Sequence, residues 1–167
     1  MLHESIEKIS SNFQQMGYLI QNDPHIPGVQ GLLYARSPSP SRQGFAKVED
    51  HFLFIDWENS VFSRLDLLLE THKKFSKFVN QGFRVPHALR MRIPNLAVVA
   101  VSLYEFPPDV IQFVRTTYLN PWYGGETGQL MLIDLTQKKV FCHYLPRFRQ
   151  QGSLPLSHAV EIISKSL

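Results

Sequence analysis

The residues best suited to chemistry are two carboxylates that follow a run of four apolar residues. The run Phe52 to Ile55 is typical of a strand buried on both faces, and Asp56-Trp57-Glu58 comes directly after it. Because side chains alternate across a strand, Asp56 and Glu58 leave on the same side, at the edge of the expected core. Two such acids could hold a metal ion. They are also what a strand end before a helix N-terminus would carry, since that terminus favours negative charge.

With a helix and strands before them, and a helix and a strand after them, these acids resemble the core of the PD-(D/E)xK nucleases. The resemblance implies Asp56 and Glu58 as catalytic residues and metal ligands, Mg²⁺ as cofactor, and a lysine that polarises the attacking water. The sequence departs from the family pattern at two points. Glu58 stands where the lysine is expected, and no Asp or Glu lies between Asp23 and Glu49, where the first ligand is expected. We therefore expect no tight metal site.

A second candidate is an aromatic and glycine-rich segment, in which Trp122 and Tyr123 precede residues 124–128, Gly-Gly-Glu-Thr-Gly. It lacks the Lys-Ser/Thr of a phosphate-binding loop and leads into a predicted strand, so we do not interpret it as a nucleotide loop. Glycines beside amphipathic aromatic residues are common in binding loops, which makes Trp122 and Tyr123 candidates for ligand or partner contact. The alternative is a hydrophobic plug over a sheet edge.

Charge is distributed unevenly along the chain. The net charge of +3 is too small to indicate nucleic-acid binding, but acidic residues dominate positions 49–70 and basic residues then follow without an acid until Glu105. The basic candidates for ligand or partner binding are Arg84, Arg90, Arg92, Arg147 and Arg149. Such segments are most often solvated faces. A single basic face would also attract a polyanion, so the candidate partners are a protein or a polyanion.

Other catalytic chemistries lack support in the sequence. The seven histidines include no pair at zinc-site spacing and no HExxH motif. There is no GxSxG nucleophile elbow, and Cys142 lies in an apolar run without an activating neighbour.

Length and composition predict one domain over residues 1–167. A single cysteine cannot form an internal disulfide, which indicates a reducing compartment. The N-terminus has Glu4 and no long apolar stretch, so we expect no signal peptide, and no run approaches the roughly 20 apolar residues of a membrane span. We therefore expect a soluble, cytoplasmic protein without membrane contact; a homo-oligomer stays open.

The elements that position these residues follow from the spacing of the apolar side chains. In chain order we predict a helix over 2–16, a strand over 29–36, a mobile Ser/Pro loop over 37–44, strand residues within 45–57, a long helix stopped by a left-handed Gly82, a strand over 96–101, a helix opening at 107–109, a hairpin from 129–134 and 140–144, and a helix over 158–166. We prefer to split residues 45–57 into two strands at a turn over Glu49-Asp50-His51.

Crossovers between strands that also form hairpins predict a mixed sheet with helices on its faces. We expect an α+β (mixed α/β) fold, with four to six strands flanked by about four helices. The predicted core comprises Phe52, Phe54, Ile55, Val98, Val99 and Val101, covered by the long helix. The expected function is noncatalytic ligand binding or macromolecular interaction without a cofactor. The alternative is a metal-dependent phosphodiesterase or nuclease, which alone would need Mg²⁺.

Overall fold

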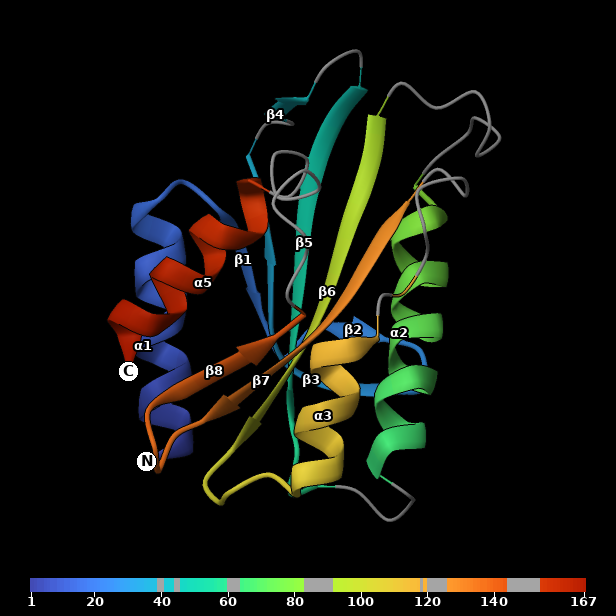
Figure 1. Cartoon of the computed structure of the whole chain (residues 1–167). Coiled ribbons are helices and arrows are strands. Elements are labelled where there is room, and N and C mark those ends of the chain that lie inside the picture. Colours follow the sequence, from blue (N-terminus) through green and yellow to red (C-terminus); the bar gives the residue numbers. More distant parts are fainter. Residues whose placement is uncertain are drawn as a thin grey trace.

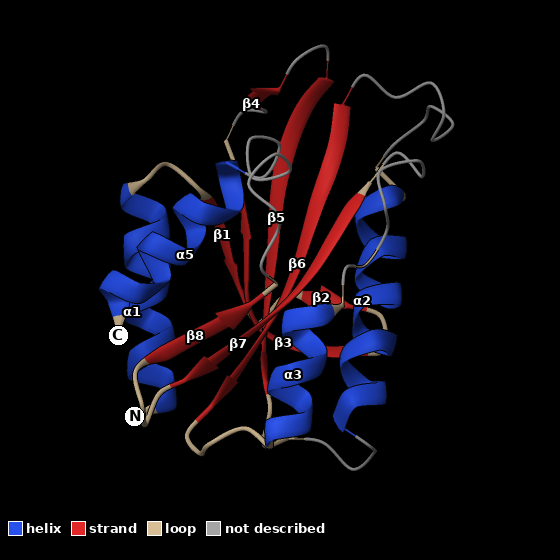
Figure 2. Ribbon diagram, viewed as in Figure 1, coloured by secondary structure: helices blue, strands red, loops and turns tan. Residues whose placement is uncertain are grey.

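A computed structural model describes residues 1–38, 41–43, 46–59, 64–82, 92–117, 119, 126–143 and 154–167. The elements are α1 (Leu2–Gln15), β1 (Leu19–Asn22), β2 (His25–Ile26), β3 (Val29–Arg36), β4 (Ser41–Gln43), β5 (Ala46–Asp56), α2 (Arg64–Asn80), β6 (Arg92–Ser102), α3 (Pro108–Thr116), β7 (Thr127–Asp134), β8 (Lys139–Cys142) and α5 (Leu154–Ser166). Figure 1 shows one twisted sheet with helices on both faces, and Figure 2 separates the helices from the strands by colour.

The sheet has the strand order β1-β3-β5-β6-β7-β8. β3 and β5 pair antiparallel, as do β7 and β8, whereas β5, β6 and β7 run parallel. Parallel neighbours need crossovers, which α2 and α3 supply. The predicted α+β fold with a mixed sheet is confirmed. Because β4 adds to β5 and β2 adds to β3, the described residues hold more strands than the four to six expected.

The central strand β5 is continuous, so the preferred split at Glu49-Asp50-His51 is wrong. Its residues pair in register with β6 from Lys47 to Asp56 without a break. The three polar residues suggested a turn, but each has polar partners inside the fold, described below, and can therefore stay in the strand.

Two further expectations about chain breaks are corrected. Within the segment predicted as a mobile loop, Ser41–Gln43 pairs with β5, and Ser37 is buried. Gly82 does not adopt the left-handed conformation predicted for it; among the described glycines only Gly17 and Gly28 have positive φ. Gly17, at φ 85°, follows α1 and ends it as expected from the left-handed region that glycine tolerates.

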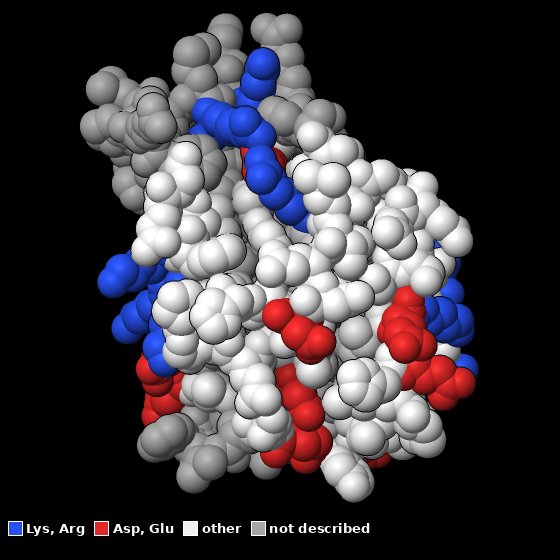
Figure 3. Space-filling view, turned by 180° about the vertical axis from the view of Figure 1, so that it is seen from behind, with Lys and Arg blue, Asp and Glu red and all other residues white. Residues whose placement is uncertain are grey.

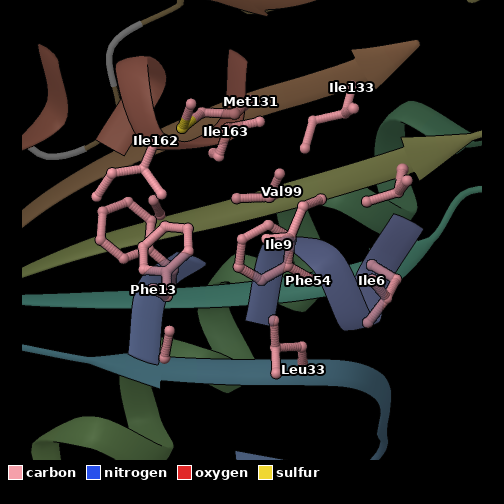
Figure 4. Packing of buried hydrophobic residues seen from close by; sticks show 14 of the residues in the cluster. Ile6, Ile9, Phe13, Leu33, Phe54, Val99, Met131, Ile133, Ile162 and Ile163 are labelled. Atoms are coloured by element: carbon pink, nitrogen blue, oxygen red, sulfur yellow. The ribbon is translucent and has the colours of Figure 1, made fainter. Parts of the chain in front are cut away.

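The core has two layers, one on each face of the sheet. On one face α1 and α5 cover Phe52, Phe54 and Val99, and Figure 4 shows Phe13 of α1 and Ile162 of α5 among this cluster. On the other face α2 and α3 cover the second cluster. All six predicted core residues are buried, which confirms the prediction. The long helix α2, however, covers only those that point to its own face, such as Ile55 and Val98.

Among the described residues, no helix combines the length and the apolar character needed to cross a membrane.

Candidate functional site

Three consecutive polar residues of β5 are buried, which is unusual for the middle of a central strand. Glu49 is 2% exposed, Asp50 5% and His51 3%. Side chains alternate along a strand, so Glu49 and His51 share the α2 face with Leu53, whereas Asp50 points to the α1 face with Phe52. Burying ionisable groups is costly unless they are paired, so their partners define this part of the molecule.

Glu49 is the centre of a charged cluster built from three strands. Arg36 at the end of β3 donates from Nε to Glu49 Oε1 over 2.5 Å. Arg92 at the start of β6 forms an ion pair with the other oxygen, Oε2. β3 and β6 lie on either side of β5, so the two arginines reach Glu49 from opposite sides. Glu49 thus neutralises one of two positive charges and fixes where both guanidinium groups lie.

His51 connects the carboxylate to Tyr34 of β3. Its Nε2 lies 3.1 Å from Glu49 Oε1, and its Nδ1 lies 2.6 Å from the Tyr34 hydroxyl. An ionised carboxylate can only accept, so the proton of a neutral His51 lies on Nε2, which faces Glu49, and Nδ1 accepts from the Tyr34 O–H. The rings of Tyr34 and His51 also stack at an interplanar angle of 14°. Both ring nitrogens of His51 therefore face groups of the cluster, Nδ1 through a hydrogen bond and Nε2 through a close contact.

The local environment fixes the protonation states of this chain. Burial by itself raises the pKa of Glu49, but the hydrogen bond and charge of His51 and those of Arg36 outweigh it and hold the pKa at about 2. Burial lowers the pKa of His51. Glu49 acts to raise it, and the positive charges of Arg36 and Arg92 lower it further. Burial raises the pKa of Tyr34 to about 12. At neutral pH the cluster therefore contains a carboxylate, a neutral imidazole and a neutral phenol.

The two arginines remain accessible even though the carboxylate is covered. Their side chains are 42% exposed for Arg36 and 45% for Arg92. Lys47 is exposed and is the register partner of Arg92, so both lie on the same face. Figure 3 shows basic side chains in a band near the end of the molecule where β5 and β6 begin, with an acidic side chain partly visible beneath them. The three cations and Glu49 together carry a net charge of +2.

Asp50 has a separate network on the opposite face. Asn95 of β6 donates from Nδ2 to Asp50 Oδ1 over 2.8 Å, and Thr127 of β7 donates to Asn95 Oδ1 over 2.8 Å. The Asp50 backbone N–H donates to Ser37 Oγ. Burial raises the pKa of Asp50 to about 6, partly offset by the hydrogen bond from Asn95 and reinforced by the charge of Glu49.

A third polar group lies between α2 and the start of β7. Ser76 Oγ donates to Glu126, and Asn80 Nδ2 donates to Glu126 Oε2 over 2.6 Å. One turn before Ser76, the buried His72 packs against Gly128; a Cβ on that glycine would lie 2.4 Å from His72 Nε2. His72 lies on the long helix α2, and its ring packs against the start of β7.

The two acids on which the nuclease resemblance rests, Asp56 and Glu58, lie far from the Glu49 cluster. Asp56 is the last residue of β5 and Glu58 lies just after it, about 23 Å from Glu49 for the seven residues of extended strand between Glu49 and Asp56. Asp56 Oδ1 accepts from the Glu58 backbone N–H, and Glu58 Oε1 accepts from Ser102 Oγ. Within the described ranges, no three His, Cys, Asp or Glu side chains are grouped to hold a metal ion.

Of the residues predicted to bind a ligand or partner, the structure places only Arg92. Trp122, Tyr123, Arg84, Arg90, Arg147 and Arg149 lie outside the described residues. Sequence reasoning missed Arg36, Glu49, His51 and Tyr34. The available signal was the spacing of two between Glu49 and His51 and between Tyr34 and Arg36, which puts each pair on one side of a strand.

Comparison of the chain with models of known protein families, with curated proteins and with solved structures found no match.

Proposed function

We propose that this protein is a noncatalytic binding domain that recognises an anionic group at Arg36 and Arg92. The observation that carries the proposal is that a buried carboxylate, Glu49, holds two half-exposed arginines from different strands. One arginine would be enough to neutralise Glu49, so the second guanidinium group leaves one positive charge uncompensated. Arginine is the residue best suited to bind anions, because its planar fork presents several donors and keeps its charge at all physiological pH values.

The arrangement favours binding over catalysis because its titratable groups are already engaged. A general base needs a free lone pair within reach of substrate. His51 is buried with both ring nitrogens turned toward other groups of the cluster, and the Glu49 oxygens contact His51 and the arginines. A nucleophilic Tyr34 would need a lowered pKa, but burial raises the pKa of its phenol. The groups that reach solvent are the guanidinium groups, whose chemistry is recognition.

The proposal is tested with inorganic polyphosphate, a polyanion without bases or sugars, titrated at low salt against Arg92→Gln and a matched control. Lys8→Gln removes the same charge from an exposed position on α1. Because displaced counterions drive such binding, we expect the slope of log affinity against log salt to fall by about one for Arg92→Gln. Lys8→Gln should behave as the wild type. Equal losses in both variants, or no binding by the wild type, would overturn the proposal.

A further inference from the structure

We infer that the group bound at this site is a phosphoryl group, that is, a tetrahedral oxyanion carrying about two negative charges. The inference rests on the proposed function and names the ligand class that the same site takes. It is carried by how the two guanidinium groups are placed relative to each other and to Glu49.

The first step concerns distance. Arg36 contacts Oε1 and Arg92 contacts Oε2 of the same carboxylate, so their guanidinium groups are close neighbours. The strands that carry them are not adjacent, because β5 lies between β3 and β6, at about 10 Å for two strand spacings. The side chains therefore converge over Glu49 from opposite sides. A ligand above Glu49 would meet one fork on each side.

The second step concerns the donors that remain. A guanidinium has five N–H donors. Toward the described residues, Arg36 uses Nε and Arg92 uses one terminal nitrogen, both on Glu49. Within the part of the chain that the structure describes, Arg36 thus retains its terminal N–H groups, and Arg92 retains Nε and the other terminal nitrogen. Each arginine keeps more than one donor for an outside acceptor.

The third step compares possible anions. A carboxylate has two oxygens in one plane and one charge, which matches a single arginine fork, as in the usual bidentate pair. A phosphoryl group has three acceptor oxygens pointing in different directions and a charge of about −1.5 to −2 at neutral pH. Two forks that approach from opposite sides, in a region of net charge +2 once Lys47 is counted, therefore match the phosphoryl group better in both number of acceptors and charge.

The fourth step concerns the cost of ordering the site. Arginine side chains normally lose conformational freedom when they bind a ligand. Here Glu49 already holds both, and Glu49 is itself held by His51, whose other nitrogen accepts from Tyr34. The site is thus largely ordered before the ligand arrives, which suits a small anion that makes few contacts.

The test is calorimetric titration of the wild-type chain with inorganic phosphate and with acetate at equal ionic strength, near pH 7.5. We expect saturable binding of phosphate, with acetate weaker by at least about tenfold, since each hydrogen bond to a charged group is worth roughly a factor of ten or more. This comparison needs no variant. Equal affinities for the two anions would overturn the inference.

The variant Arg36→Lys/Arg92→Lys keeps both charges and removes both forks. We expect it to lose phosphate affinity by about tenfold or more and to retain salt-dependent binding of polyphosphate. Unchanged phosphate affinity in this variant would refute the phosphoryl inference and leave the proposed function standing. If the wild type binds neither phosphate nor polyphosphate, both the phosphoryl inference and the proposed function are refuted.

Discussion

Asp50→Asn should stabilise the protein at neutral pH, because the buried carboxylate is costly to ionise. Asp50 is 5% exposed and accepts a hydrogen bond from Asn95 through Oδ1. Asparagine keeps that acceptor at the same position and removes the charge. The backbone bond from residue 50 to Ser37 does not involve the side chain and is retained.

The magnitude follows from the pKa values. Burial raises the pKa of Asp50 from 3.8 to about 6 in the folded protein. Below pH 3.8 the group is protonated in both folded and unfolded states, so it has no effect on stability. Above pH 6 it is ionised in both, and the folded state bears the full cost of about 3 kcal/mol, at 1.36 kcal/mol for each pKa unit. The stability gained by Asp50→Asn should therefore rise from near zero at pH 4 to at most about 3 kcal/mol at pH 7.5.

The assay is urea unfolding of wild type and variant at half-unit steps between pH 4 and pH 8. Asp109→Asn, at an exposed position on α3, is the matched control for loss of a carboxylate. The quantity to follow is the free energy of unfolding of Asp50→Asn minus that of wild type. The reasoning is refuted if this difference does not change with pH, or if it is smaller at pH 7.5 than at pH 4.5.

Three further predictions concern other parts of the fold, each measured by urea unfolding. Glu49→Gln should lower stability at pH 7 by at most about 3 to 4 kcal/mol, since the pKa of Glu49 is held at about 2 instead of 4.5. It should also abolish the loss of stability that wild type shows as pH falls from about 4.5 to 2. An unchanged acid limb would contradict this. Gly128→Ala should cost about 1 to 3 kcal/mol because its Cβ would lie 2.4 Å from His72 Nε2. Gly82→Ala should cost less, because its Cβ would lie 3.5 Å from the Val79 backbone oxygen, an ordinary contact distance; equal effects would argue against the packing described. Phe54→Ala should cost about 3 to 5 kcal/mol, and an unchanged midpoint would show that Phe54 is not in the core.

The fold class was predictable because apolar spacing is a local property that burial imposes directly. The run Phe52 to Ile55 and the β-branched stretch around Val98 indicated buried strands, and both lie at the centre of the sheet. The continuity of β5 was not predictable in this way. Glu49, Asp50 and His51 have the composition of a turn, and only partners far along the chain, such as Arg92 and Asn95, keep them in a strand.

The candidate site was only partly predictable for a related reason. Arg92 was identified from its place in a basic segment, but its charge alone did not reveal its partner. The pairing with Glu49 depends on the register of β5 against β6, and the contribution of Arg36 depends on β3 lying on the other side. The acids that drew attention in the sequence, Asp56 and Glu58, lie at the opposite end of the strand.

The central claim is that Glu49 arranges Arg36 and Arg92 for an anion, and the phosphate affinity of Glu49→Gln tests it most directly. The substitution adds one unit of positive charge to the site, so attraction by net charge alone would make phosphate bind more tightly. If Glu49 orders the two arginines, the variant should bind phosphate more weakly than wild type in spite of that added charge. The measurement is calorimetric titration with inorganic phosphate at constant ionic strength and pH 7.5, on variant protein shown by circular dichroism to be folded. Weaker binding is the predicted result, and equal or tighter binding would contradict the account.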